Sequence, residues 1–219
     1  RKILFDNGEF YHVFNRGVNK QNIFTGAQSY KRLLNILAFY QYQGGVKYSR
    51  FIGLPKKDQV LSLNNLLKSP KIVEIICYCL MPNHFHFLLI QKNDNGISNF
   101  LRLLQNSYTR YYNTKFGRVG PLFQGQFKAV RIEDDSQLLH VSRYIHLNPY
   151  SSFLTRTLSD LENYPYSSYK EYLGKSNPGL CQKNIILSHF KANVTYQKFI
   201  EDEADYQRSL DIMKHKLLD

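Results

Sequence analysis

The sequence specifies a β-hairpin more clearly than any other element. Residues 72–80 and 84–91 are both strongly β-prone, and only Met81, Pro82 and Asn83 separate them. A short connection that contains proline is typical of a turn, because proline cannot donate a hydrogen bond to a central strand. These two runs therefore predict neighbouring antiparallel strands.

Further strands and helices are expected on both sides of this hairpin. The residue patterns predict strands over residues 10–15 and 126–133, and helices over residues 28–42, 98–112 and 134–147, the last ended by Asn148 and Pro149. Residues 46–70 are predicted to form a loop with at most a short helix. This order predicts an α+β fold, an antiparallel sheet with helices packed on it, of the split βαβ ferredoxin-like kind.

The pattern of the last part of the chain predicts short helices and no candidate catalytic or metal-binding residues. They are expected within residues 164–172, 184–190 and 196–218. We therefore divide the chain into a main domain, residues 1–160, and a C-terminal helical appendage, residues 161–219.

The charge of the chain indicates a polyanionic partner. Lys and Arg number 29 against 17 Asp and Glu, a formal net charge of +12, and nucleic acid is the leading candidate. A membrane partner is not expected, because no apolar run reaches about 18 residues. Three cysteines, an odd number, make a disulfide framework unlikely and favour a reducing cytoplasm.

Cys77 and Cys79 lie near two histidines in the sequence, which would suit a zinc site. Both fall within an apolar strand, where small buried side chains are expected. Structural burial is the better interpretation.

Two histidines at the start of the second hairpin strand form a candidate metal site. His84 and His86 are two positions apart, so their side chains point to the same face while Phe85 and Phe87 point to the other. Two imidazoles on one face can bind one ion. The alternative is that both histidines are merely hydrogen-bonded or solvated.

A second group of polar residues lies at the end of the helix predicted over residues 134–147. Tyr144 and Asn148 are four positions apart and share a helix face, and His140 lies one turn earlier on that face. His140 could be a further ligand or an orienting group. The alternative is that all three lie on a solvated polar face.

Together these segments resemble a known family. The run Met81-Pro82-Asn83-His84-Phe85-His86-Phe87-Leu88, followed by Tyr144-Ile145-x-x-Asn148-Pro149, resembles the single-tyrosine HUH transposases, in particular the REP-associated tyrosine transposases. Residues 11–17 and 120–128 support the resemblance, which extends over residues 10–150 in the order of the family.

The resemblance implies an activity and a set of site residues. His84 and His86 would bind a divalent metal, Mg²⁺ or Mn²⁺, with Asn148 as a third contact, either directly or through water. Tyr144 would be the catalytic nucleophile that cleaves single-stranded DNA beside hairpins, through a 5′-phosphotyrosine intermediate, and then transfers the strand. The chain would work in the prokaryotic cytoplasm at the nucleoid, as a monomer or as a homodimer that exchanges the tyrosine helix.

Two other functions remain open at this point. A replication-initiator or relaxase-type nickase uses the same histidine and tyrosine chemistry, and a catalytically idle protein could bind hairpins without cutting them. Tyr108, Tyr111 and Tyr112 are rival nucleophiles, but their apolar spacing favours helix packing.

Several basic residues are candidate DNA phosphate contacts, although each could equally be an ordinary solvated charge. They are Arg16, Lys20, Arg102, Arg110, Arg118, Lys128 and Arg131.

Overall fold

A four-stranded antiparallel sheet organises the molecule. We analysed a computed structural model, which describes residues 4–176, 179–190 and 195–216. The strand order is β2-β3-β1-β4. The strands are β1 (Phe10–Arg16), β2 (Val73–Met81), β3 (His84–Gln91) and β4 (Lys128–Arg131). The predicted antiparallel hairpin is therefore confirmed as β2 and β3.

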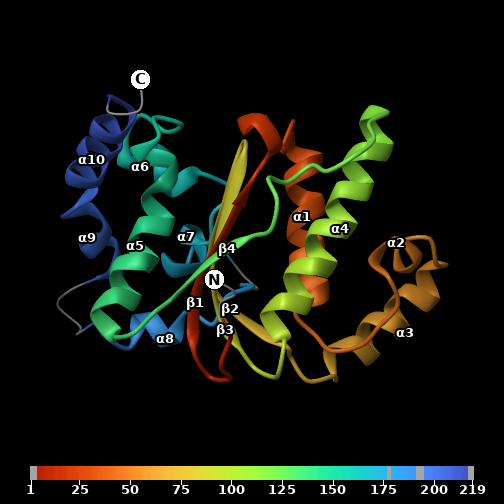
Figure 1. Cartoon of the computed structure of the whole chain (residues 1–219). Helices are drawn as coiled ribbons and strands as arrows, with labels where there is room; N and C mark the ends of the chain where they lie inside the picture. The colour runs from red at the N-terminus through yellow and green to blue at the C-terminus, as the bar shows by residue number, and fades with distance from the viewer. Residues whose placement is uncertain (1–3, 177–178, 191–194, 217–219) are drawn as a thin grey trace.

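Helices cover both faces of the sheet (Figure 1). One face carries α1 (Ala27–Tyr40) and α4 (Gly96–Phe116), and the opposite face carries α5 (Asp135–Ser151). Phe85 and Phe87 of β3 lie in the core under α1 and α4, whereas Leu88 and Ile90 lie in the core under α5. This α+β arrangement confirms the predicted fold class.

Residues 46–70 form more helix than their sequence predicts. They contain α2 (Tyr48–Phe51) and a full helix, α3 (Lys56–Leu67), in place of the expected loop. Only Leu66 of α3 is buried, while Leu61 and Leu67 are 54% and 52% exposed. The helix therefore lacks the continuous apolar stripe on which its detection from sequence depends.

Three other elements, α5, α4 and β4, begin or end at residues other than the predicted ones. α5 continues through Pro149 to Ser151, although proline was expected to end it, and α4 is longer at both ends than residues 98–112. Pro149 lies in the last turn, where the lost backbone donor removes only one helical hydrogen bond. β4 is shorter than residues 126–133 because it pairs only with β1, over four residues.

The C-terminal part of the chain packs against the face of the sheet that α5 covers. Its helices are α6 (Leu158–Asn163), α7 (Tyr169–Tyr172), α8 (Asn184–Leu187), α9 (Tyr196–Glu201) and α10 (Ala204–Lys216). Of the helix expected over residues 196–218, the last two residues lie outside the described part. Tyr169, Ile186 and Ile200 share one buried cluster with β2 and α5. A division at residue 160 stays a prediction, since the core is continuous across it.

The segment before α7 also protects the outer edge of the sheet. The backbone N–H of Leu80 donates to the carbonyl of Tyr166, and that of Ser168 donates to the carbonyl of Tyr78. These bonds occupy groups on β2 that would otherwise form an open edge. Among the described helices, none is long and apolar enough to cross a membrane.

Candidate active site

The two hairpin histidines lie on the face of the sheet that α5 covers. In β3, His84 is paired with Arg16 of β1 and His86 with Phe14, while Phe85 and Phe87 point to the opposite core. The rings of His84 and His86 are 5.0 Å apart, centroid to centroid, and perpendicular. The alternation of a strand thus brings the two imidazoles together, as the spacing predicts.

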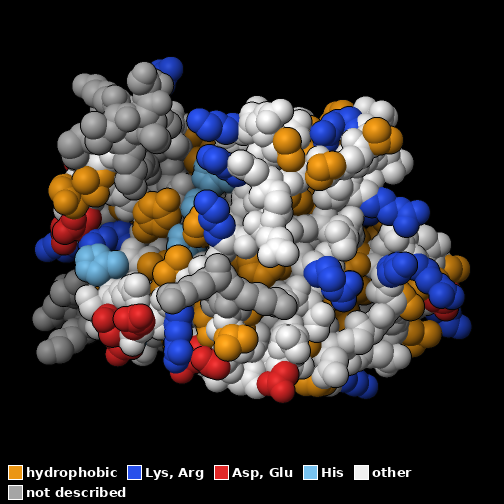
Figure 2. All heavy atoms as spheres, in the orientation of Figure 1, with side chains coloured by type: hydrophobic (Ala, Val, Ile, Leu, Met, Phe, Trp, Pro, Cys, Tyr) orange, Lys and Arg blue, Asp and Glu red, His pale blue; other side chains and the backbone are white. Residues whose placement is uncertain are grey.

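Helix α5 brings Tyr144 and Asn148 to the same place. The side chain of Asp134 caps the start of the helix by accepting from the Gln137 backbone N–H. Two turns later the Tyr144 ring meets the His86 ring edge to face, with centroids 5.4 Å apart. The arrangement forms within one chain, and Figure 2 shows histidine side chains at the surface there, with Lys and Arg side chains gathered beside them.

The contacts of His84 suit a cation. Nδ1 of His84 lies 2.6 Å from Oδ1 of Asn83, and Nε2 lies 3.5 Å from Oδ1 of Asn148. Both amides are oriented by their own donors, since Asn83 Nδ2 donates to the Lys20 carbonyl and Asn148 Nδ2 donates to the Tyr144 carbonyl. If Nδ1 of a neutral ring donates to Asn83, then Nε2 of His84 and Oδ1 of Asn148 are two neighbouring atoms that can each act as a metal ligand.

The 3.5 Å between these two atoms fits a pair of ligands in one coordination shell. Donor atoms that each lie about 2.1 Å from an ion are roughly 3 to 3.5 Å from one another. No group of three His, Cys, Asp and Glu side chains suited to a metal occurs in the described part of the chain. The residues that could hold an ion here are therefore two imidazoles and an amide: His84, His86 and Asn148.

His12 is part of this site, although it was not among the sequence-predicted site residues. It lies on β1, and its Nε2 is 2.9 Å from Nδ1 of His86. Burial lowers the pKa of His12 to about 4 and holds the pKa of His86 well below its usual value, with the charges of neighbouring histidines adding to the second shift. Both rings are thus neutral at pH 7, and one donates to the other.

The contact between His12 and His86 orients the second ring. When Nδ1 of His86 is the donor, its Nε2 keeps a lone pair for a ligand. In the sequence His12 is only a histidine on a predicted strand, a feature too common to indicate a site. Its role can be inferred only when β1 is known to lie beside β3.

We expect His12→Phe to weaken the binding of Mn²⁺ by roughly 10- to 100-fold, because the ring of His86 loses the acceptor that fixes its tautomer. His12→Gln, which restores an acceptor, should recover part of the affinity. Titration calorimetry with Mn²⁺ measures both, and equal affinity of wild type and His12→Phe would contradict the assigned role.

Helix α10 holds α5 in position. Gln207 Nε2 donates to the Tyr144 carbonyl at 3.2 Å, and Arg208 donates from Nε and Nη2 to the Tyr150 carbonyl. The Arg208 guanidinium also lies over the Tyr150 ring, 3.3 Å from its centroid. The C-terminal helices therefore fix the helix that carries the tyrosine.

His140, the other candidate ligand, has a different neighbour. Its Nδ1 accepts from the Arg143 guanidinium at 2.7 Å, and Arg143 in turn covers the ring of Phe199. His140 is exposed at the outside of α5, whereas Asn148 touches His84. Of the two residues, Asn148 has the position expected of a third ligand.

The rival tyrosines lie on the other side of the sheet. Tyr108 is fully buried and donates to the Ile23 carbonyl, and Tyr112 donates to the Asn22 carbonyl. Burial raises the pKa of Tyr108 far above its usual value. Both side chains belong to the core under α1 and α4, which agrees with the helix-packing interpretation.

The two strand cysteines are buried, as predicted. Cys77 and Cys79 are inaccessible to solvent, and no disulfide joins them. Burial raises the pKa of the Cys79 thiol well above its usual value, which disfavours the thiolate that would bind zinc.

Three of the candidate phosphate contacts lie near the histidines. Arg16 is paired with His84, and its Nε donates to Gln124 Oε1 at 2.6 Å. Lys128 is paired with Phe14, and so its side chain points to the same face of the sheet. The Lys20 carbonyl accepts from Asn83 at the hairpin turn.

The other four candidates lie elsewhere. Arg131 forms ion pairs with Asp6 and Glu9, at 3.1 and 3.2 Å. Arg118 packs over the Tyr112 ring, and Arg102 and Arg110 line a cavity beside α4. The structure therefore does not bring all seven basic residues into one surface.

Comparison with known proteins identifies a similar family. Residues 46–148 match the family model described as transposase IS200 like. A search of curated proteins found no match.

The chain also matches two solved structures, of which the first is similar in fold. A REP-associated tyrosine transposase bound to a REP hairpin matches with a TM-score of 0.54 and 15% sequence identity, over 80% of this chain and 84% of that chain. A candidate transposase from Deinococcus radiodurans R1 matches with a TM-score of 0.36 and 14% identity, over 66% of this chain and 94% of that chain. Over residues 46–148, the chain is therefore similar to the transposase IS200-like family.

Proposed function

We propose that this transposase cleaves single-stranded DNA and transfers the cut strand through a covalent bond to Tyr144. The observation that carries the proposal is the edge-to-face contact between the Tyr144 ring and His86, which is itself beside His84. A nucleophile must lie within a few ångströms of the groups that polarise its target. The family match to residues 46–148 supports the same assignment.

In this proposal each residue has a separate role. Tyr144 Oη gives up its proton to solvent as it attacks the phosphorus, the bond from phosphorus to O3′ breaks, and the leaving oxygen takes up a proton from solvent to become a 3′-hydroxyl. The 5′-phosphotyrosine conserves the energy of the phosphodiester, so another 3′-hydroxyl can reverse the reaction and join strands. A divalent ion bound by His84, His86 and Asn148 would supply positive charge to the non-bridging oxygens.

Binding and orientation of the strand would depend on the neighbouring basic residues. Arg16 and Lys128 point to the face of the sheet that carries His84 and His86. Their charges would hold the backbone on either side of the scissile phosphate. We also propose that the substrate includes a hairpin, because the similar REP-associated transposase is bound to one.

We expect cleavage to require a divalent ion. A 5′-labelled oligonucleotide with a hairpin and a single-stranded flank should be cut when Mg²⁺ or Mn²⁺ is added in large excess over the protein. Removal of the ion by EDTA should stop cleavage, and added Mn²⁺ should restore it. Cleavage that continues unchanged in EDTA would contradict the role given to His84, His86 and Asn148.

A further inference from the structure

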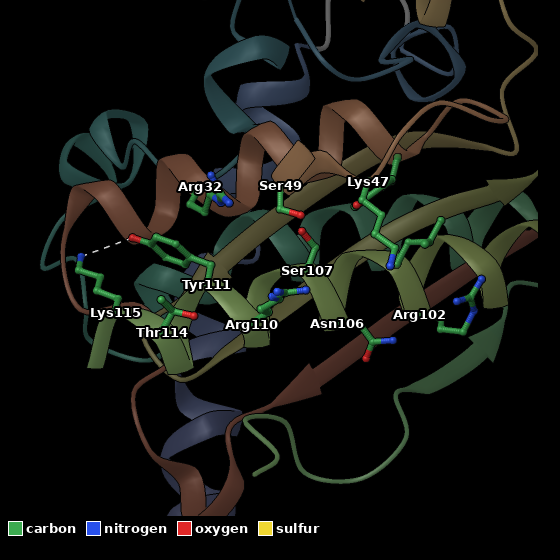
Figure 3. A pocket seen from close by; sticks show the side chains of 12 residues that line it. Arg32, Lys47, Ser49, Arg102, Asn106, Ser107, Arg110, Tyr111, Thr114 and Lys115 are labelled. Carbon is green, nitrogen blue, oxygen red and sulfur yellow. Dashed lines mark hydrogen bonds between the residues drawn. The ribbon is translucent and has the colours of Figure 1, made fainter. Parts of the chain in front are cut away.

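A cavity lined by several cationic side chains lies on the opposite side of the sheet from Tyr144. It has a volume of about 560 Å³ and lies between α1, α4 and the start of α2 (Figure 3). Five cationic side chains line it: Arg32, Lys47, Arg102, Arg110 and Lys115. No Asp or Glu is among its lining residues.

The charges in this cavity are not neutralised by the protein. None of these five cations takes part in a salt bridge within the described residues. Lys115 donates to the neutral oxygens of Gln28 and Tyr111 (Figure 3 shows the second bond). Five like charges around one space repel each other, and an anion in that space would remove the repulsion.

Arg32 adds an unmet hydrogen-bond donor. Its Nε is buried and has no partner among the described residues. The guanidinium is held between the rings of Tyr48 and Tyr111, 4.8 and 5.0 Å from their centroids. A buried N–H without an acceptor costs about 1–3 kcal/mol, so a bound oxyanion that supplied one would be favoured.

The shape of the cavity suits a chain of phosphates rather than one ion. Arg102, Asn106 and Arg110 follow one another at four-residue spacing along the exposed side of α4. Eight residues of helix span about 12 Å, whereas successive phosphates of a strand are roughly 3.4 Å apart along a duplex axis. The row can therefore contact several phosphates of one backbone, and Lys47 and Arg32 flank it from the other wall.

We propose that this cavity binds the phosphodiester backbone of a DNA segment other than the strand at Tyr144. It is a second nucleic-acid site, separated from the first by the sheet, because α1 and α4 cover one face and α5 covers the other. The choice of DNA as the polyanion rests on the proposed function. The site would anchor duplex or flanking DNA while the single strand is cut.

The test is the salt dependence of DNA binding by an Arg102→Gln/Arg110→Gln variant. This variant, the control variant described below and the reference protein all carry Tyr144→Phe. Binding of a labelled hairpin with a single-stranded flank is measured in EDTA, so that the result does not depend on cleavage. Loss of two phosphate contacts should reduce the slope of log K against log salt by about 2 and weaken binding tens-fold at low salt. Lys56→Gln/Lys57→Gln removes two exposed charges outside the cavity and should keep the slope near that of wild type.

Several outcomes would overturn the proposal. One is an unchanged salt slope in the Arg102→Gln/Arg110→Gln variant, and another is an equal loss of slope in the Lys56→Gln/Lys57→Gln control. A third is that millimolar inorganic phosphate or ATP displaces the hairpin from the protein with the intact cavity but not from the arginine variant, which would indicate a site for free phosphates. If the arginine variant unfolds, Lys47→Gln/Lys115→Gln tests the same cavity from its other side. An unchanged salt slope in the arginine variant of a protein that cleaves normally would contradict the cavity proposal alone. A reduced slope in a protein that does not cleave DNA would contradict the proposed function alone.

Discussion

Tyr144→Phe is expected to lose DNA cleavage by at least about 10³-fold and to form no covalent adduct, because the proposed nucleophile is the phenolic oxygen that the substitution removes. The substitution removes one oxygen and keeps the ring, whose packing against His86 and His12 should hold α5 in place. DNA binding should therefore stay within about twofold of wild type, since binding depends on many backbone contacts. Denaturing gels of a labelled oligonucleotide measure both the cut product and the slow-migrating adduct.

A matched control for this substitution is Tyr206→Phe. Tyr206 is 62% exposed on α10, and its hydroxyl has no place in the proposed reaction. Normal cleavage by this control, with loss in Tyr144→Phe, would assign the effect to the site. If Tyr144→Phe cut DNA at the wild-type rate, another nucleophile would have to be found.

His84→Ala is expected to reduce cleavage by about 10³-fold or more while DNA binding is largely retained. In the proposed site the imidazole would be one of two nitrogen donors to the ion, and an ion bound by the remaining groups would be held weakly. His84 is only half-buried, so its truncation should cost little stability, whereas His86 is 6% exposed and its truncation would leave a cavity. For this reason His86→Asn, which keeps a polar side chain, is the better second variant.

His189→Ala provides the control, since His189 is an exposed histidine on the far C-terminal segment. Cleavage is followed at saturating DNA and at rising Mn²⁺. Excess Mn²⁺ should partly rescue His86→Asn, because an amide oxygen is a weaker but usable ligand. Parallel loss of DNA binding and of the thermal unfolding transition in His84→Ala would point to misfolding and would contradict the assigned role.

The hairpin and the two histidines could be predicted from sequence because both depend on local rules. Alternation along a strand decides that His84 and His86 share a face, and four-residue spacing decides that Tyr144 and Asn148 do. Whether the histidine pair and the helix pair lie close together depends on which face of the sheet α5 covers, and no local pattern decides this. The resemblance to HUH transposases predicts that the two pairs share one site.

The remaining features depend on tertiary contacts that no local pattern records. His12 joins the site only because β1 lies beside β3, so its ring reaches His86 from a position 74 residues away. The clamp of Gln207 on Tyr144 has the same origin, with 63 residues between them. α3 was not predicted because its apolar residues are largely exposed and do not form the continuous apolar face by which a helix is recognised in a sequence.

Identification of the modified residue tests the central claim most directly. The chain would be incubated with Mn²⁺ and an oligonucleotide in which the fragment released with a 3′-hydroxyl, on the 5′ side of the cut, is short enough to diffuse away, which traps the covalent state. After digestion with protease and nuclease, mass spectrometry of the peptide that contains Tyr144 should show a nucleotide joined through its 5′-phosphate to that residue. Cleavage without an adduct, or an adduct on Tyr111 or any other residue, would contradict the account.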